Sequence, residues 1–202
     1  MAARRYYPIF LNLKGRYVLL FGGGSVALRK AKLFLKTGAV LTIVSKDFSE
    51  SFQTFAKAHS LGLKRGYALG GSLRKFSLVV SATSDTGFNR KIYQKCLKEN
   101  IFVNVVDNPQ HSTFIVPSSL KRGPLEIAIS TGGASPLLAK LIRKMLGRQF
   151  GSEYRNMVLW LQKERKKVKQ MILEQKERRQ HFQKLIETKF RSILERSEGK
   201  KR

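Results

Sequence analysis

The chain has 202 residues, of which 42% are hydrophobic and 26% charged, and this ordinary globular composition excludes a disordered or fibrous protein. No apolar run approaches the roughly 18–20 residues needed to cross a bilayer, and the single Cys96 excludes an internal disulfide. We expect a cytoplasmic protein with no transmembrane segment and no signal peptide. The net charge of +27 favours a polyanionic partner: nucleic acid, an anionic membrane surface, or a substrate rich in carboxylates.

The first hundred residues alternate between short apolar segments and segments with helical spacing. Strands are expected at 17–21, 40–44, 63–67, 76–82 and 101–106, and helices at 25–37, 48–59 and 89–100. In the first helix we expect Leu33 and Phe34 on the apolar side and Lys30 among the solvated basic residues, with Gly38 at its C-terminal end. This alternation predicts a parallel, doubly wound sheet, hence a Rossmann-like α/β fold.

The pattern changes after Pro109. Short strands are expected at 114–116 and 125–130, with a turn at 121–124 between them, and helical spacing continues from Pro136 with a break near 175–179. We therefore predict three parts: a Rossmann domain at 1–110, a small α+β segment at 111–146, and a helical domain at 147–202.

A glycine cluster follows the first predicted strand. Residues 22–27, Gly-Gly-Gly-Ser-Val-Ala, match the pattern G-x-G-x-x-A between a strand and a helix, the context in which this pattern binds dinucleotides. Glycine allows a tight turn and a close approach to a pyrophosphate, while the helix N-terminus offers free N–H groups and the positive end of its dipole. The alternative is a glycine turn that serves only tight strand–helix packing.

The end of the second predicted strand holds the residues that would face the adenosine ribose. An acidic residue is expected there, but the sequence reads Ser45, Lys46, Asp47. Lys46 could favour the 2′-phosphate of NADP, so the choice between NAD and NADP stays open. Asp47 is either a ribose ligand or the N-cap of the next helix.

Further polar residues follow the later strands. Thr83 and Asp85 are placed for cofactor contact or for capping the next helix. Asn104, in a buried strand, has the cofactor amide or a backbone hydrogen bond in the core as candidate partners. Asp107 lies where ligands bind in open parallel sheets, or else it caps local N–H groups in an Asp-Asn-Pro turn.

A second loop of small residues, 130–135, precedes a helix that starts near Pro136. Its backbone N–H groups could hold a substrate carboxylate, and a simple capped helix start is compatible with that role.

Five motifs occur in order along the chain: 22–30, GGGSVALRK; 82–85, ATSD; 104–109, NVVDNP; 114–118, FIVPS; and 129–136, ISTGGASP. Together they resemble the precorrin-2 dehydrogenase family, the dehydrogenase/ferrochelatase module of siroheme synthases. The resemblance continues through 178–182, so it covers nearly the whole chain. We expect no methyltransferase domain of the kind that some family members carry.

The resemblance implies NAD-dependent dehydrogenation of precorrin-2 to sirohydrochlorin, followed in some members by insertion of ferrous iron. It also implies a homodimer joined through the middle and C-terminal segments, which makes 111–146 a dimerisation segment, and it assigns Asp107 as the catalytic acid/base residue. The predicted cofactor-binding residues are Gly22, Gly23, Gly24, Ser25, Val26, Lys46, Asp47, Thr83 and Val105. The predicted substrate-binding residues are Asn104, Ser130, Thr131, Gly132 and Ser135. Precorrin-2 is an acidic tetrapyrrole, which agrees with part of the positive charge.

Other readings remain open. His59, His111 and His181 lack metal-ligand spacing, so no resident metal is expected. His111, near Asp107 in sequence, either lies in a surface loop, which is favoured, or assists protonation or iron entry. Cys96 is expected in the core. One alternative is a chelatase with weak or lost dehydrogenase activity. Another is a dinucleotide-fold protein whose basic surface binds nucleic acid or an anionic membrane without catalysis, although RNA-binding aromatic motifs and zinc knuckles are missing.

Overall fold

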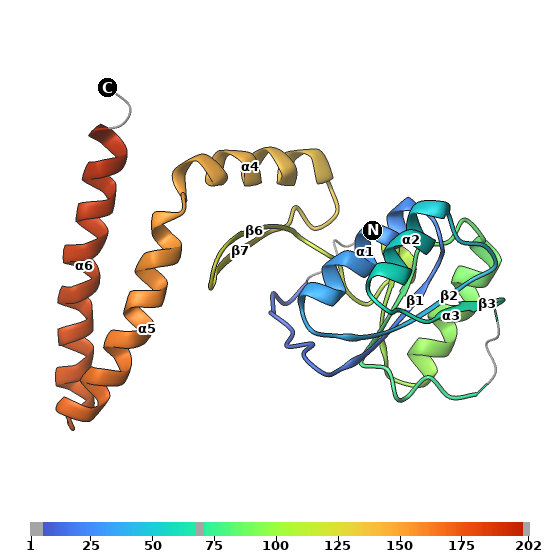
Figure 1. Cartoon of the computed structure of the whole chain (residues 1–202), viewed down its shortest axis with the longest axis horizontal. Coiled ribbons are helices and arrows are strands. Elements are labelled where there is room, and N and C mark those ends of the chain that lie inside the picture. Colours follow the sequence, from blue (N-terminus) through green and yellow to red (C-terminus); the bar gives the residue numbers. More distant parts are fainter. Residues whose placement is uncertain (1–5, 68–70, 200–202) are drawn as a thin grey trace. The chain divides into compact units, whose positions relative to one another are not determined.

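A computed structural model of the chain describes residues 6–67 and 71–199 (Figure 1). The chain divides after Val116 into two compact units. In the part of the chain that the structure describes, no helix is long and apolar enough to cross a membrane.

The first unit is built on five parallel strands. They are β1 (Tyr17–Phe21), β2 (Val40–Ser45), β3 (Leu63–Arg65), β4 (Leu78–Ser81) and β5 (Phe102–Val105). Their order in the sheet is β3-β2-β1-β4-β5, and every neighbouring pair is parallel. The predicted Rossmann-like fold is confirmed. Because the strands are parallel, all of their carboxyl ends lie at one edge, where ligands bind in such sheets.

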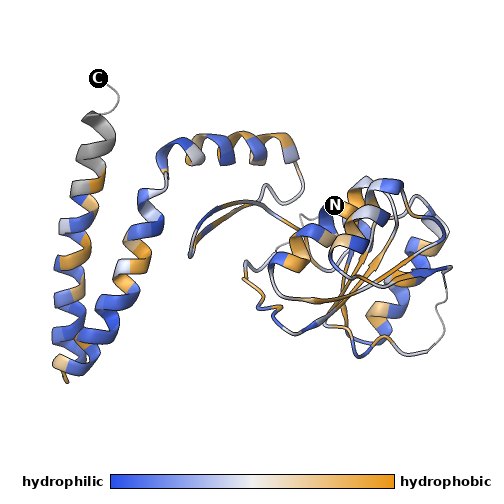
Figure 2. Ribbon diagram, in the orientation of Figure 1, coloured by the Kyte–Doolittle hydropathy of each residue, from blue (hydrophilic) through white to orange (hydrophobic). Residues whose placement is uncertain are grey.

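Helices cover both faces of this sheet: α1 (Ser25–Lys36), α2 (Glu50–Ala58) and α3 (Thr86–Lys98). Successive side chains of β1 point to opposite faces. Val18 and Leu20 pack with α1 and α2, whereas Leu19 and Phe21 pack with α3. The strands are the most hydrophobic part of the unit, as Figure 2 shows. A strand buried on both faces needs apolar residues at successive positions, which accounts for the unbroken apolar run of β1.

The helix predicted at 25–37 exists, but the prediction of which of its residues are buried was partly wrong. Ala27, Leu28 and Ala31 face the core, while Leu33 is 50% exposed. Small alanines let α1 approach the sheet closely, so Lys30, which was expected in solvent, is half-buried. Gly38 directly follows the helix C-cap with φ +75°, as its predicted role requires.

The second unit begins with an antiparallel hairpin, β6 (Ser118–Arg122) and β7 (Leu125–Ile129). The predicted strand at 114–116 is therefore wrong. Thr113 and Phe114 lie beside β5 instead: Thr113 N–H donates to the Val103 carbonyl at 2.8 Å, and the Phe114 carbonyl accepts from Asn104 Nδ2 at 3.1 Å. Pro117 then separates this segment from β6, since proline has no N–H for a ladder.

Three helices complete this unit: α4 (Pro136–Gln149), α5 (Glu153–Met171) and α6 (Gln175–Gly199). The predicted break near 175–179 falls slightly earlier, at 172–174. Tyr154 and Met157 of α5 pack with Ile193 of α6. The rest of α5 and the coloured part of α6 are mostly hydrophilic (Figure 2). The hairpin and all three helices form one compact unit, and the three-part division predicted from the sequence stays a prediction.

Candidate dinucleotide site

The turn after β1 is held by its glycines. Gly22 has φ +121°, a region that L side chains rarely adopt, and its N–H donates to the Val44 carbonyl at 2.9 Å. A Cβ on Gly22 would collide with the backbone of Ala82. The turn is therefore clamped between the ends of β2 and β4.

Gly23 is pressed against the loop that follows β2. A Cβ there would collide with the Asp47 carbonyl oxygen and would lie 2.9 Å from Phe48 Cα. The Gly23 carbonyl accepts from Ser49 N–H at 2.9 Å, which fixes this approach. The first two glycines are thus needed by the fold itself, and their contact with a cofactor stays a prediction.

Gly24 is different, because a Cβ there would meet nothing within 4 Å. Gly24 is the N-cap of α1 and has extended backbone. Because glycine has no side chain, the first-turn amides of Ser25 and Val26 receive no cap from it. Ala27 is fully buried, which seats the helix close to the sheet. Open space in front of free amides and a helix dipole fits the pyrophosphate of a dinucleotide.

At the end of β2, Asp47 is not the N-cap of α2, because Ser49 holds that position. This alternative for Asp47 is wrong. The Asp47 side chain is 91% exposed, and its Oδ1 lies 3.9 Å from Arg65 Nη1. The carboxylate is therefore free to turn toward a ribose, as the remaining alternative requires.

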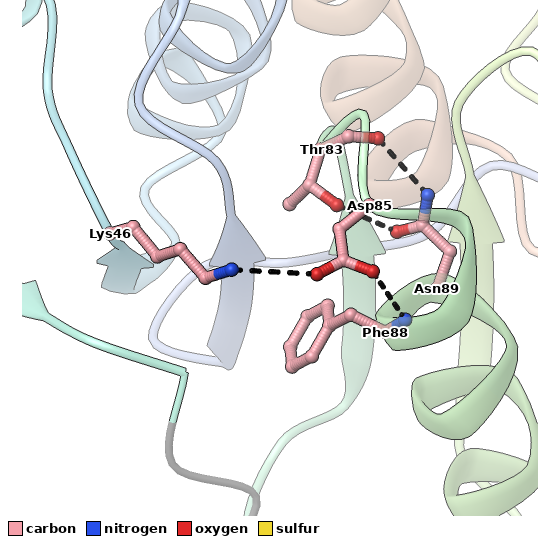
Figure 3. A network of polar contacts seen from close by, with 5 residues as sticks. All are labelled: Lys46, Thr83, Asp85, Phe88 and Asn89. Carbon is pink, nitrogen blue, oxygen red and sulfur yellow. Dashed lines mark hydrogen bonds and ion pairs between the residues drawn. The ribbon is translucent and has the colours of Figure 1, made fainter.

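Lys46 is joined to the loop after β4 (Figure 3). Its Nζ lies 3.6 Å from Asp85 Oδ2, and Asp85 Oδ1 accepts from Phe88 N–H at 2.9 Å. Asp85 is the N-cap of α3, so the capping alternative holds for this residue. The hydrogen bond from the Phe88 amide lowers the pKa of Asp85, and the charge of Lys46 adds to this.

Thr83 belongs to a second set of contacts in the same loop (Figure 3). Its Oγ1 donates to Asn89 Oδ1 at 3.0 Å, and Asn89 Nδ2 donates to the Thr83 carbonyl, also at 3.0 Å. Ser81 Oγ donates to Asn89 Oδ1 at 2.6 Å. Asn89 thus fixes the loop after β4, and a cofactor contact by Thr83 stays a prediction.

At the end of β5, Asp107 is exposed and has φ +60°. The local cap is Asn108, whose Oδ1 accepts from His111 N–H at 3.1 Å, so the turn does not depend on Asp107 for capping. Lys30 of α1 interacts electrostatically with Asp107. Burial lowers the pKa of Lys30 and the charge of Arg29 lowers it further, whereas the charge of Asp107 raises it. A half-buried ammonium therefore interacts electrostatically with the predicted catalytic carboxylate.

Two predicted residues of β5 lie deeper. Val105 is 2% exposed and packs in the core between the sheet and α3. Asn104 is also buried, and its Nδ2 donates to the Phe114 carbonyl, which is the core hydrogen bond named as an alternative. Their contact with cofactor and substrate stays a prediction.

The predicted substrate loop lies in the second unit, between β7 and α4. Ser130 Oγ accepts from Gly132 N–H, Thr131 Oγ1 accepts from Ser135 N–H, and Ser135 Oγ caps α4 through Leu138 N–H. Gly132 has φ +65° and open space around it. The hydroxyls order the loop, so its backbone amides are the groups that a ligand would meet.

Histidine and cysteine do not form a metal site in the described residues, where no group of three or more His, Cys, Asp or Glu side chains is suitably placed. His111 is half-buried, and its ring lies 5.2 Å from that of Tyr93. Cys96 is fully buried as predicted, and desolvation raises the pKa of its thiol to about 12.

Three residues near the site were not predicted: Lys30, Arg65 and Tyr67. Tyr67 stacks on Phe88 at 4.2 Å between ring centroids, and Lys46 Nζ lies 5.1 Å above the Tyr67 ring. Arg65 could have been predicted as a site residue from its position at the end of β3, because that strand ends at the ligand-binding edge of the sheet.

Comparison with known families agrees with this geometry. A family described as "Putative NAD(P)-binding" matches residues 9–118, and one described as "Sirohaem biosynthesis protein central" matches residues 122–149. The predicted dinucleotide-binding domain is confirmed at the level of NAD(P), without a choice between the two cofactors.

Similar proteins include siroheme synthases. The chain is 38% identical over 189 residues to "Siroheme synthase" of Photorhabdus laumondii and 37% identical over 181 residues to "Siroheme synthase 2" of Yersinia enterocolitica. These matches cover 94% and 90% of the chain but 40% and 38% of the relatives' own lengths. A solved structure, "SirC, precorrin-2 dehydrogenase", is similar with a TM-score of 0.74 and 29% identity, covering 96% of this chain and 100% of that one.

Proposed function

Because the chain belongs to the family of precorrin-2 dehydrogenases and siroheme synthase N-terminal modules, NAD(P)-dependent oxidoreductases of siroheme biosynthesis, we propose that it oxidises precorrin-2 to sirohydrochlorin. The observation that carries the proposal is the edge of the parallel sheet, where the open Gly24 turn and the exposed carboxylate of Asp107 both lie. This edge offers a dinucleotide cradle and a proton acceptor together.

The cradle is made by backbone. The N–H groups of Ser25 and Val26, with the positive end of the α1 dipole, would hold the pyrophosphate, and Gly24 leaves room for it. When bound, the nicotinamide accepts a hydride from the substrate.

Asp107 completes the balance of the reaction. Precorrin-2 loses two hydrogens: one leaves as hydride to the cofactor, and the other leaves as a proton, for which the Asp107 carboxylate is the acceptor. Lys30, which interacts electrostatically with Asp107, adds positive charge for the acidic substrate.

NAD is the proposed cofactor. Asp47 is free to accept a hydrogen bond from a ribose hydroxyl, whereas its negative charge would repel a 2′-phosphate. The substrate carboxylates are assigned to the loop that holds Ser130, Thr131, Gly132 and Ser135, through its backbone amides.

A homodimer is also proposed. The helix α4 lies largely within the matched central segment and exposes an apolar stripe, visible between hydrophilic positions in Figure 2. Leu137, Leu138, Leu141 and Met145 are between 47% and 66% exposed. Such a stripe on a helix of this length is typical of an interface.

The fully buried Cys96 thiol is consistent with the reducing, cytoplasmic setting that we propose.

Iron insertion into sirohydrochlorin is a second candidate, because the relatives matched by this chain are named siroheme synthases. Metallation releases pyrrole protons, and the Asp107 carboxylate would accept these as well. Purified chain supplied with sirohydrochlorin and ferrous iron, without dinucleotide, tests this activity separately.

The main proposal is tested with purified chain, precorrin-2 and NAD+, following the absorbance of sirohydrochlorin. We expect conversion by the chain and a loss of about 100-fold or more in kcat for Asp107→Asn, in line with the usual contribution of a general base. No NAD+-dependent conversion would overturn the proposal. If salt-sensitive binding to nucleic acid appeared instead, the basic-surface alternative would replace it.

A further inference from the structure

We propose that the ion pair of Lys46 and Asp85 is a clasp across the adenosine half of the dinucleotide crevice, and that Asp85 makes the chain select NAD over NADP by engaging Lys46. This inference rests on the proposed dinucleotide-dependent function and names the residues that set its cofactor selectivity.

The position of the clasp follows from the strand order. Lys46 follows β2 and Asp85 follows β4, and β1 lies between these two strands in the sheet. The ion pair therefore spans the carboxyl end of β1, the strand that the glycine turn follows (Figure 3). A dinucleotide whose pyrophosphate lies at Gly24 must extend its adenosine toward the end of β2, past this pair.

Both ends of the clasp are ordered by one aromatic pair. Tyr67 supports Lys46, whose Nζ lies 5.1 Å above its ring, and Tyr67 stacks on Phe88 with an interplanar angle of 20°. The Phe88 amide in turn holds Asp85 at 2.9 Å. The side chains of Lys46 and Asp85 are nevertheless 63% and 41% exposed, so the pair is weak enough to open for a ligand.

Two ion pairs lie at this edge of the sheet. Lys46 pairs with Asp85, and Arg65 lies 3.9 Å from Asp47, so each of these cations already has an anionic partner. A 2′-phosphate brings a further charge of about −1.5 to −2. NADP must therefore compete with Asp85 for Lys46 beside the negative Asp47, whereas the ribose hydroxyl of NAD needs only an acceptor.

The discriminating variant is Asp85→Asn. Asparagine keeps the N-cap oxygen for Phe88 N–H, so α3 stays capped, but the negative charge is lost and Lys46 is released. We expect the ratio of NADP+ affinity to NAD+ affinity to rise by about threefold to tenfold, the effect of one freed cation at an exposed site.

The gain must depend on Lys46. Lys46→Met keeps an unbranched side chain near Tyr67 but removes the cation, and it should weaken NADP+ binding more than NAD+ binding. In the double variant, Asp85→Asn should no longer raise the ratio, because no cation remains to be freed.

Glu99→Gln is the matched control. It changes the net charge by the same amount as Asp85→Asn but at the other end of α3, which is about 20 Å away over 13 residues. Glu99 accepts from Ser72 Oγ and Leu73 N–H, and glutamine retains an acceptor oxygen for these groups. We expect an unchanged cofactor ratio.

The experiment is calorimetric titration of the full chain and its variants with NAD+ and with NADP+ at one fixed ionic strength. A higher ratio in Asp85→Asn alone, absent from Glu99→Gln and from the double variant, supports the clasp. Equal ratios in Asp85→Asn and Glu99→Gln, or a gain that persists without Lys46, overturn the clasp and leave the proposed function intact. Binding of neither dinucleotide by the unmodified chain overturns both.

Discussion

The glycine turn separates the needs of the fold from the needs of the ligand. Gly24→Ala places a methyl group where no protein atom lies within 4 Å, and the extended backbone of Gly24 suits alanine. The expected cost in stability is about 1 kcal/mol or less, because alanine is a poorer N-cap than glycine. The variant should therefore fold normally.

Dinucleotide binding should suffer instead. The new methyl group stands in the space through which the pyrophosphate approaches the amides of Ser25 and Val26. Weakening one hydrogen bond to a charged group costs about 1.5–3 kcal/mol, which corresponds to roughly 10- to 100-fold weaker NAD+ binding.

Gly23→Ala is the opposite case. Its methyl group would collide with the backbone at Asp47 and Phe48, so the loop after β2 must move. Overpacking of this kind costs about 1–3 kcal/mol, and a lower midpoint in urea is the expected result.

The assay pairs urea unfolding with NAD+ titration for both variants, with Gly62→Ala as the control. Gly62 also has open space around its Cβ position but lies outside the turn, so alanine there should change neither binding nor stability by much. Wild-type NAD+ affinity in Gly24→Ala would refute the cradle, and wild-type stability in Gly23→Ala would refute the close approach of the two loops.

Three other outcomes are expected. Lys30→Met should raise the melting temperature at neutral pH, because burial lowers the pKa of Lys30 and its charged form therefore destabilises the fold below that pKa. The gain in melting temperature should shrink as the pH rises toward about 10. A lower melting temperature of the variant at about pH 7 would contradict this expectation. Leu141→Glu should shift the chain from dimer to monomer in light scattering, and a dimer that survives the charge would exclude α4 from the interface. Burial raises the thiol pKa of Cys96 to about 12, so Cys96 should react with a thiol reagent at pH 8 only after denaturation. Because the thiol pKa is lower in the unfolded chain, the free energy of unfolding should fall as the pH rises above about 8.5.

Much of the fold was readable because it depends on local pattern. The apolar runs of β1 and β4 and the glycine turn between β1 and α1 are short-range features, and each was predicted within a few residues. The strand at 114–116 was wrong, since this part of the chain is tied to β5 through side chains: Thr113 Oγ1 accepts from Val103 N–H, and Asn104 Nδ2 of β5 donates to the Phe114 carbonyl. Sequence periodicity carries no information about that exchange.

The site was readable only in part for a similar reason. Asp107 and Gly24 lie at strand ends, which the order of elements reveals. The pairing of Lys46 with Asp85 needs the strand order, and the burial of Lys30 needs the close approach of α1 that Ala27 and Ala31 permit. These are consequences of packing between distant segments, which a helical period cannot express.

The central claim is that one turnover couples the cofactor to the tetrapyrrole. Its most direct test is the stoichiometry of the purified chain under anaerobic conditions, with NADH and sirohydrochlorin measured in the same sample. We expect one NADH for each sirohydrochlorin formed, and no sirohydrochlorin when the dinucleotide is omitted. Sirohydrochlorin formed without matching NADH, or no turnover at saturating NAD+, would contradict it.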